Sequence, residues 1–175
     1  MKTMIISAFP GCGKTYIYEN QEKYNYKVLD SDSSKFEKNT HWETLYVDHI
    51  CDNIGKYDFI FIAQYPKVLE LLHLRNVPFI IVAPDNSSLL SNKERQLIKQ
   101  QWFGRFLLRN NSHIKDLTEW IEQLKSNYDD WTSYEHLTMY NPSECILLKE
   151  DEYLSDKIDY LYAKKEQLQK IKILK

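Results

Sequence analysis

The sequence predicts an α/β fold in three layers, with a mainly parallel five-stranded sheet and helices on both of its faces. Three observations lead to this fold. Short apolar runs alternate along the chain with stretches whose apolar residues recur at helical spacing. Residues 58–63 and 78–83 contain uninterrupted apolar runs, which are typical of strands covered on both faces. Connections of these lengths imply right-handed crossovers, so the carboxyl ends of the strands meet at one edge.

The first part of the chain predicts a strand, a helix and a second strand. Residues 4–7 form a short apolar strand, and a helix begins at Lys14 and continues until Asn25 interrupts it. Residues 26–29 form the second strand, which leads into a loop rich in Ser and Asp at residues 30–34. Polar side chains therefore follow directly on the carboxyl end of this strand.

The middle of the chain predicts two helices around a buried strand. Thr40 with Glu43 forms a capping box that opens a helix, and this helix ends at Gly55. The strand at residues 58–63 comes next, and its apolar character places it inside the sheet. Pro66 suits the first turn of the following helix, which leads to the strand at residues 78–83.

The last third predicts three helices and a final strand. Ser91 with Glu94 forms a second capping box, which opens a long helix over residues 93–110 with a basic face. Residues 114–124 form a further amphipathic helix, while residues 129–142 are assigned to no element. Residues 145–149 predict the last strand. A helix is expected from Glu150 onward, because its acidic-then-basic charge order suits the helix dipole.

Length and composition indicate one ordered domain that covers residues 1–175, in which residues 91–112 form a basic helix and candidate lid. Hydrophobic residues make up 43% of the 175 residues, with only 4 Gly and 5 Pro, which is typical of a globular protein. The formal net charge of -2 creates no global field that would draw the chain to nucleic acid or an anionic membrane. The remaining function classes must therefore be judged from local motifs.

The N-terminal segment and the cysteines indicate the cellular compartment of the protein. Residues 1–7 form too short an apolar run for a signal peptide, and no stretch approaches the roughly 18 apolar residues of a membrane span. We therefore expect an intracellular, cytoplasmic protein with no membrane partner. The 3 cysteines include no Cys-x-x-Cys pair, so neither a disulfide framework nor a zinc site is indicated. Cys51 and Cys145 are expected to fill the core.

The segment from Ala8 to Thr15, Ala-Phe-Pro-Gly-Cys-Gly-Lys-Thr, predicts a phosphate-binding loop between the first strand and the first helix. Its two glycines let the chain turn successive backbone N–H groups inward. Lys14 supplies a mobile cation for the β- and γ-phosphates, and the Thr15 hydroxyl supplies a ligand for Mg²⁺. The pattern Gly-x-x-x-x-Gly-Lys-[Ser/Thr] is met except at its first position, where Ala8 replaces Gly. The residues expected to bind a nucleoside triphosphate are Pro10, Gly11, Cys12, Gly13, Lys14, Thr15 and Tyr16.

This loop resembles that of small P-loop kinases of the adenylate kinase and nucleoside-monophosphate kinase type, whose Pro-Gly-x-Gly-Lys core it shares. The order of elements over residues 1–112 is similar as well, and small phosphoryl-transfer proteins of phages and low-GC bacteria look similar in size and layout. The resemblance implies a P-loop NTPase fold with a helical lid, and ATP and Mg²⁺ as cofactors. In that family an Asp-Gly-Phe-Pro-Arg segment follows the third strand, and residues 63–67, Ala-Gln-Tyr-Pro-Lys, stand in its place. Lys67 would then replace the arginine that holds the acceptor's phosphate, without its bidentate grip, and Ala63 replaces a metal-associated aspartate.

Asp30 and Asp32 follow the second strand, at the place where hydroxyl-phosphorylating kinases, such as those resembling shikimate kinase or the polynucleotide kinases, carry an aspartate. Alternate positions of an extended chain point the same way, so both carboxylates can serve one site. We assign Asp32 to catalysis, as the group that accepts the hydroxyl proton, and Asp30 to metal binding, and we assign both to acceptor binding. The alternative is a solvated Ser/Asp-rich turn.

Arg105 and Arg109 lie four residues apart on one face of the basic helix, where they could face a transferring phosphoryl group. This placement matches the lid of the resembled family. Together with Lys14 and Asp32 they are the candidate catalytic residues, and the alternative for each arginine is a solvated basic face.

Three functions fit these motifs. The leading hypothesis is an ATP-dependent phosphotransferase whose acceptor is a small nucleotide-like molecule, above all a (deoxy)nucleoside monophosphate. The second is a kinase of a hydroxyl on a metabolite, a sugar or, less favoured, a polynucleotide end, which would use Asp30 and Asp32. The third is a regulatory protein that binds ATP without catalysis, because Ala63 lacks a carboxylate. A switch-type GTPase is disfavoured because no Asn-Lys-x-Asp segment occurs.

Overall fold

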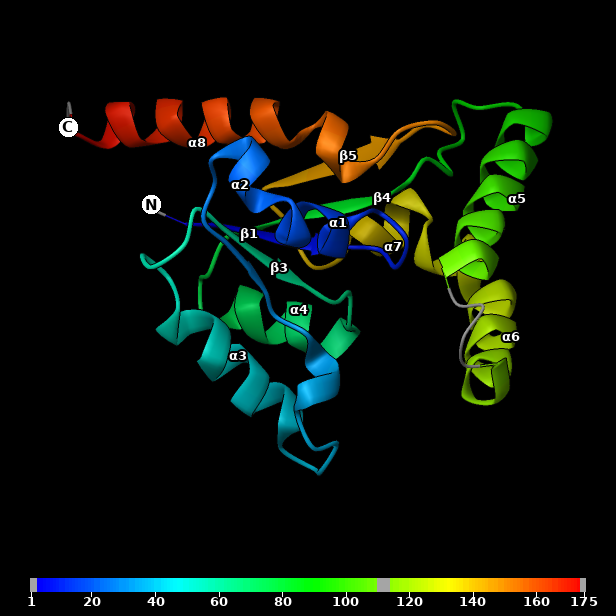
Figure 1. The fold of residues 1–175 in the computed structure, drawn as a ribbon, viewed down its shortest axis with the longest axis horizontal. Coiled ribbons are helices and arrows are strands. Elements are labelled where there is room, and N and C mark those ends of the chain that lie inside the picture. Colours follow the sequence, from blue (N-terminus) through cyan, green and yellow to red (C-terminus); the bar gives the residue numbers. More distant parts are fainter. Residues whose placement is uncertain (1–2, 110–113, 174–175) are drawn as a thin grey trace.

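A five-stranded sheet, parallel throughout, forms the centre of the protein in a computed structural model that describes residues 3–109 and 114–173 (Figure 1). The strands lie in the order β2-β3-β1-β4-β5, so β1 is central and β3 is interior. This arrangement confirms the predicted α/β class and the parallel five-stranded sheet. The strands are β1 (Met4–Ala8), β2 (Val28–Asp30), β3 (Phe59–Ile62), β4 (Phe79–Pro84) and β5 (Glu144–Leu148).

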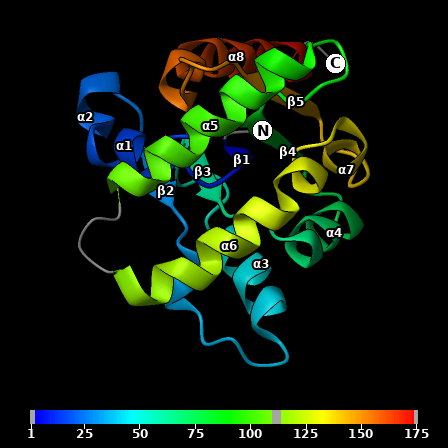
Figure 2. The ribbon, with the colours of Figure 1, turned by 90° about the vertical axis from the view of Figure 1, so that its right-hand side faces the viewer.

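Helices cover both faces of the sheet (Figure 1). One face carries α1 (Lys14–Glu19), α2 (Gln21–Tyr24) and α8 (Ile158–Ile173), and the other carries α3 (Trp42–Asp52) and α4 (Pro66–Leu74). The long helices α5 (Asn92–Arg109) and α6 (Ile114–Trp131) stand beyond the carboxyl ends of the strands, and the short α7 (Tyr134–Thr138) follows them (Figure 2). Two short 3₁₀ turns, η1 (Ser33–Lys35) and η2 (Leu154–Asp156), complete the described elements.

Burial explains the apolar character of the inner strands. Every residue of β1, β3 and β4 is buried, whereas the edge strands β2 and β5 are mostly half-buried. An inner strand of a parallel sheet is covered on both faces, so its sequence lacks the alternation of a half-exposed strand. Cys51 and Cys145 are partly buried and pack against this core, in agreement with their expected role.

Several predicted boundaries need correction. The helix predicted from Lys14 to Asn25 is broken at Asn20 into α1 and α2. The Thr40/Glu43 capping box is wrong, because α3 has His41 as its N-cap and no side-chain cap bond, and this helix ends at Asp52. The Ser91/Glu94 capping box is confirmed: Glu94 N donates to Ser91 Oγ at 3.3 Å, and Ser91 N donates to the Glu94 carboxylate at 2.8 Å.

The C-terminal helix was predicted too early, since α8 begins at Ile158 rather than at Glu150. The backbone between them is engaged by other parts of the chain: the carbonyls of Glu150 and Glu152 accept hydrogen bonds from Arg105, and Leu154 N donates to Cys12 O at 2.9 Å. The segment left unassigned at residues 129–142 contains the end of α6 and all of α7. Among the described helices none combines the length and the apolar character that a membrane crossing requires.

An ion pair between a buried lysine and a partly buried aspartate connects α8 to the sheet. Lys165 Nζ donates to the Asp58 carboxylate just before β3, and it lies 4.3 Å from the centre of the Tyr162 ring. The side chain of Lys165 is 4% exposed and that of Asp58 is 30% exposed. Burial by itself would raise the pKa of Asp58, but the hydrogen bonds from Lys165 and from the Lys27 amide outweigh it and lower this pKa.

We expect Lys165→Met to lower the free energy of unfolding by about 1–3 kcal/mol at neutral pH, because it leaves a partly buried carboxylate without its partner. Lys125→Met is the control, since its pair with Glu122 is exposed on both sides and should contribute less than about 1 kcal/mol. Urea denaturation measures both changes.

The same pair should make stability depend on pH. A depressed Asp pKa contributes stability that is present above the ordinary value of 3.8 and is lost as the pH falls through the lower folded value. The difference between wild type and Lys165→Met should therefore shrink in this acidic range. A difference that stays constant as the carboxylate titrates would show that the pair is not its source.

Candidate functional site

The loop that joins β1 to α1 turns at two glycines in the left-handed region. Gly11 has φ 82° and Gly13 has φ 96°, a region that side-chain-bearing residues rarely adopt. Ala8 is the last residue of β1 and is fully buried, so the alanine at the first motif position lies in extended strand and needs no left-handed conformation. The departure from the motif is thus compatible with the loop's path.

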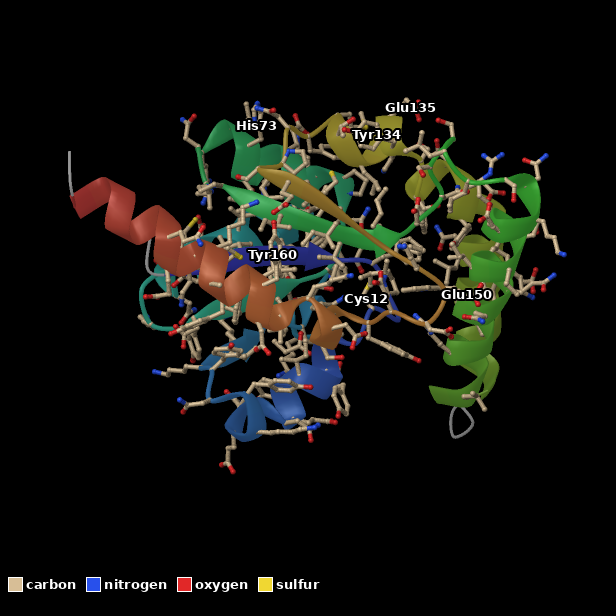
Figure 3. All side chains as sticks on the ribbon, turned by 90° about the horizontal axis from the view of Figure 1, so that it is seen from above. Cys12, His73, Tyr134, Glu135, Glu150 and Tyr160 are labelled. Atoms are coloured by element: carbon tan, nitrogen blue, oxygen red, sulfur yellow. The ribbon has the colours of Figure 1, made fainter. Side chains whose placement is uncertain are left out.

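Contacts from distant parts of the chain hold this loop in place. Phe9 N donates to Val82 O at 2.8 Å, which ties the start of the loop to β4. Trp102 of α5 donates from Nε1 to Pro10 O at 2.7 Å, and Leu154 N donates to Cys12 O at 2.9 Å. Figure 3 shows Cys12 near the middle of the molecule and Glu150 in the segment that runs beside α5. The loop therefore lies between α5 and the segment that precedes α8.

The Cys12 side chain belongs to the core rather than to the loop's open side. Cys12 is fully buried, and its Sγ lies 3.5 Å from Val82 O. Burial raises the pKa of its thiol to about 12, against which the nearby Lys14 and Arg105 charges have a smaller effect. Cys12 can contribute backbone to a phosphate site, while its thiol stays protonated.

Lys14, Thr15, Asp30 and Asp32 line one pocket of about 410 Å³ at the carboxyl ends of β1 and β2. Thr15 Oγ1 donates to Asp30 Oδ2 at 3.3 Å, and Lys14 Nζ donates to the carbonyl of Ala8. The other lining residues are Ala8, Pro10, Gly11, Gly13, Tyr18, Glu19, Ser31, Ser33, Lys35 and Ala63. The structure thus brings most of the predicted loop residues and both aspartates to one cavity, as the strand order requires.

Tyr46 of α3 holds the inner wall of this pocket. Its side chain is fully buried, and its hydroxyl donates to Ser31 O. The same hydroxyl oxygen accepts a hydrogen bond from Ala63 N at 3.4 Å. These bonds join the segment after β2 to the segment after β3. The Ser31 hydroxyl is itself buried and has no hydrogen-bond partner within the described part of the chain.

Asp32 is ionised at neutral pH and oriented by its neighbour. The Ser34 amide donates to Asp32 Oδ1 at 2.9 Å, and the Ser34 hydroxyl donates to Oδ2 at 2.7 Å. Burial opposes ionisation, but these bonds and the Lys35 and Lys38 charges together lower the pKa of Asp32. A carboxylate in this state accepts a hydrogen bond and orients a hydroxyl more readily than it retains a proton.

Besides Cys12, three predicted site residues do not line this pocket: Tyr16, Lys67 and Arg105. Tyr16 is 48% exposed and does not line it. Lys67 lies on the exposed side of α4, where it pairs with Glu70 at 2.9 Å. Arg105 does not face the pocket: it donates to the carbonyls of Glu150 and Glu152 and stacks 4.0 Å from the centre of the Tyr153 ring. The side chain of Arg109 lies outside the described residues.

Some residues in or beside this pocket were not predicted as site residues from the sequence. Tyr18 lies four positions after Lys14, and this spacing on one helical face was a usable signal. Lys35 is the last residue of η1, a short turn that the sequence did not predict. The Tyr153 ring lies against Gly13, where an added Cβ would approach it to 3.6 Å, and no local pattern predicts this contact.

The donor set fits a magnesium ion better than a transition metal. Thr15 and Asp30 offer a hydroxyl and a carboxylate oxygen side by side, and Mg²⁺ is usually held by few protein oxygens together with phosphate and water. The described residues contain no cluster of three or more His, Cys, Asp or Glu side chains that would form an all-protein metal site. The ion would therefore depend on a bound phosphate for its remaining ligands.

A larger cavity, of about 800 Å³, lies elsewhere, between the segment after β4 and the helices α5 to α7. Tyr134 and Glu135 on its wall are far from Cys12 in Figure 3. Among the described residues that line it, Arg95 is the one cation, and it already donates to Asn92. We regard the loop pocket as the candidate site, because cations, carboxylates and the two left-handed glycines meet there.

Comparison with known proteins adds no relative: no protein-family model matches the chain, and no curated protein matches its sequence. The case for a function therefore depends on the geometry of the site.

The buried thiol gives a chemical test of the loop's packing. In the folded protein near pH 8, we expect Cys12 to resist alkylation, because its thiol is both inaccessible and protonated. In urea it should react at the rate of an ordinary thiol. Mass spectrometry of peptides after timed alkylation measures this, and rapid labelling of Cys12 in the folded state would contradict the described packing.

Proposed function

We propose that the protein is a Mg²⁺-dependent phosphotransferase that binds ATP at residues 8–15 and passes the γ-phosphate to a small acceptor. One observation carries the proposal: the left-handed Gly11 and Gly13 share a pocket with Lys14 and with the Thr15–Asp30 pair. Loops of this kind place several N–H donors around a polyphosphate. The parallel sheet supports a P-loop fold, although other α/β nucleotide-binding folds have similar sheets.

Each residue has a role that its position supports. The backbone of Gly11 and Gly13 would surround the β-phosphate, and Lys14 would exchange its bond to Ala8 O for phosphate oxygens. Thr15 and Asp30 would hold Mg²⁺, which neutralises charge on the β- and γ-phosphates when it is bound. Catalysis in such a site comes mainly from positioning and charge neutralisation.

The geometry favours a hydroxyl acceptor over a monophosphate. Lys67, the residue expected to hold an acceptor phosphate, is paired with Glu70 outside the pocket. Asp32 lines the pocket and is ionised, so it can accept a hydrogen bond from a hydroxyl and align its oxygen with the γ-phosphorus. This hydroxyl-kinase alternative thus has more support than the monophosphate that the sequence favoured.

A monophosphate acceptor stays the second candidate because Lys35 also lines the pocket, with its side chain on the same segment as Asp32. A lysine there offers a point charge to an acceptor phosphate. In that case Lys35, rather than Lys67, would be the residue that determines acceptor affinity.

We expect Lys14→Ala to weaken MgATP binding by about 10- to 100-fold, because a charge-assisted bond to phosphate is lost. Lys67→Ala is the matched control, and it should leave the affinity unchanged because its ammonium lies outside the pocket. Isothermal titration calorimetry measures both. Equal affinity in wild type and Lys14→Ala would exclude the proposed nucleotide site, whereas tight binding with no transfer to any acceptor would favour the ATP-binding regulator.

A second experiment should distinguish the roles of Asp30 and Asp32. Asp32→Asn should lower kcat by about 100-fold or more with little change in MgATP affinity, since it removes the group that orients the hydroxyl. Asp30→Asn should instead raise the Mg²⁺ concentration needed for activity. Steady-state ADP release with and without acceptor measures both effects. Full activity in Asp32→Asn, together with loss of activity in Lys35→Ala, would favour the monophosphate.

A further inference from the structure

A third cavity, of about 320 Å³, adjoins the loop pocket. The two cavities share Pro10 and Ala63 in their walls, so they are neighbours at the same edge of the sheet. This third cavity lies between the loop, the segment after β3 and the helices α6 and α7. Its walls include Phe9 and Pro10, so it lies directly beside the loop proposed to bind phosphate.

The walls of this cavity are largely aromatic. Phe9, Tyr65, Trp131 and His136 contribute rings to the lining, and Tyr65 is held edge-on against Trp42 with ring centres 5.1 Å apart. Of the described residues that line it, none is Asp, Glu, Lys or Arg. Such a cavity offers no lysine or arginine to a phosphate, whereas its flat apolar walls suit a planar ring.

Gln64 supplies an amide whose hydrogen bonds are largely unmet. Its Nε2 lies 3.5 Å from Trp131 O, at the long limit for a hydrogen bond, and its Oε1 is buried without a partner in the described part of the chain. Buried amides are normally satisfied, so an unmet one on a cavity wall points to a ligand. An amide presents a donor and an acceptor together, which complements the edge of a heterocyclic base.

We infer that this cavity holds the planar heterocycle of the acceptor, and that the acceptor is a nucleoside whose sugar hydroxyl reaches Asp32. The inference rests on the proposed function. In the transfer step the hydroxyl oxygen bonds to the γ-phosphorus and the bond from this phosphorus to the β–γ bridging oxygen breaks. ADP then leaves, and the hydroxyl proton passes by way of Asp32 to solvent. Gln64 and Trp131 determine specificity, because they contact the ring and not the reacting atoms.

The same ring chemistry could come from the base of ATP, and the experiment distinguishes the two sources. Isothermal titration of the full chain with each common nucleoside is carried out with and without saturating MgADP. At least one nucleoside should bind in both conditions, and Gln64→Leu should weaken this binding by about ten-fold or more without changing the affinity for MgADP.

Matched variants keep the test independent of folding. Gln100→Leu, an exposed glutamine on α5, should leave nucleoside binding unchanged. Trp131→Ala should weaken the binding, and Trp131→Phe should largely restore it, since a flat ring is retained. Where Gln64→Leu does not fold, Gln64→Glu replaces the amide donor by a second acceptor and should also weaken the binding.

Three results would overturn the inference. One is that no nucleoside binds, and another is that the Gln64 variants bind nucleosides as well as wild type does. The third is that these variants lose affinity for MgADP instead, which would assign the cavity to the base of ATP. Failure of the proposed function would appear separately as absent MgADP binding, and nucleoside binding in the absence of MgADP would then still decide the inference.

Discussion

The left-handed turn at Gly11 and Gly13 is the constraint on which the site depends. Two residues with φ of 82° and 96° within three positions bend the chain sharply between β1 and α1, and only glycine adopts this conformation without strain. The turn is supported from outside the loop by Trp102 and by the backbone of Leu154. A site built from backbone amides needs such support, because its geometry is that of the main chain itself.

The sheet explains why the other groups gather around this turn. Because β1 is central and β3 lies between it and β2, the segments that follow these three strands are neighbours at one edge. Tyr46 reinforces the arrangement by bonding to the segments after β2 and β3 together. Asp30 stands next to Thr15, so a carboxylate is present beside the loop even though Ala63 offers none. The acidic group of the proposed metal site thus comes from the end of β2 and not from the segment after β3.

Local sequence patterns predicted those strands, helix starts and caps that depend on a few adjacent residues. The apolar strands, the Pro66 helix start and the Ser91 cap follow from the character of a few adjacent residues, and the structure confirms them. The glycine spacing likewise predicted the turn. The irregular segment at residues 150–157 could not be predicted, because its backbone is held by Arg105 and by the loop, which are distant in sequence.

The role of Arg105 could not be predicted from the sequence either, because its partners are distant along the chain. Its spacing from Arg109 suggested a cation for the phosphoryl group, but an arginine can equally satisfy backbone carbonyls and stack on an aromatic ring, and the partners for both lie in the 150s segment. Lys67 was also placed by its position in a pattern, and its neighbour Glu70 provides the closer partner. Long cationic side chains reach several partners, so their roles depend on tertiary contacts that a single sequence does not specify.

The central claim is that main-chain amides of the β1–α1 loop bind the phosphates of a nucleotide. The most direct measurement follows the backbone amide resonances of the ¹⁵N-labelled protein during titration with MgADP. We expect the largest shifts at Gly11, Gly13, Lys14 and Thr15. Shifts that are absent there, or that gather instead around the larger cavity after β4, would contradict this claim.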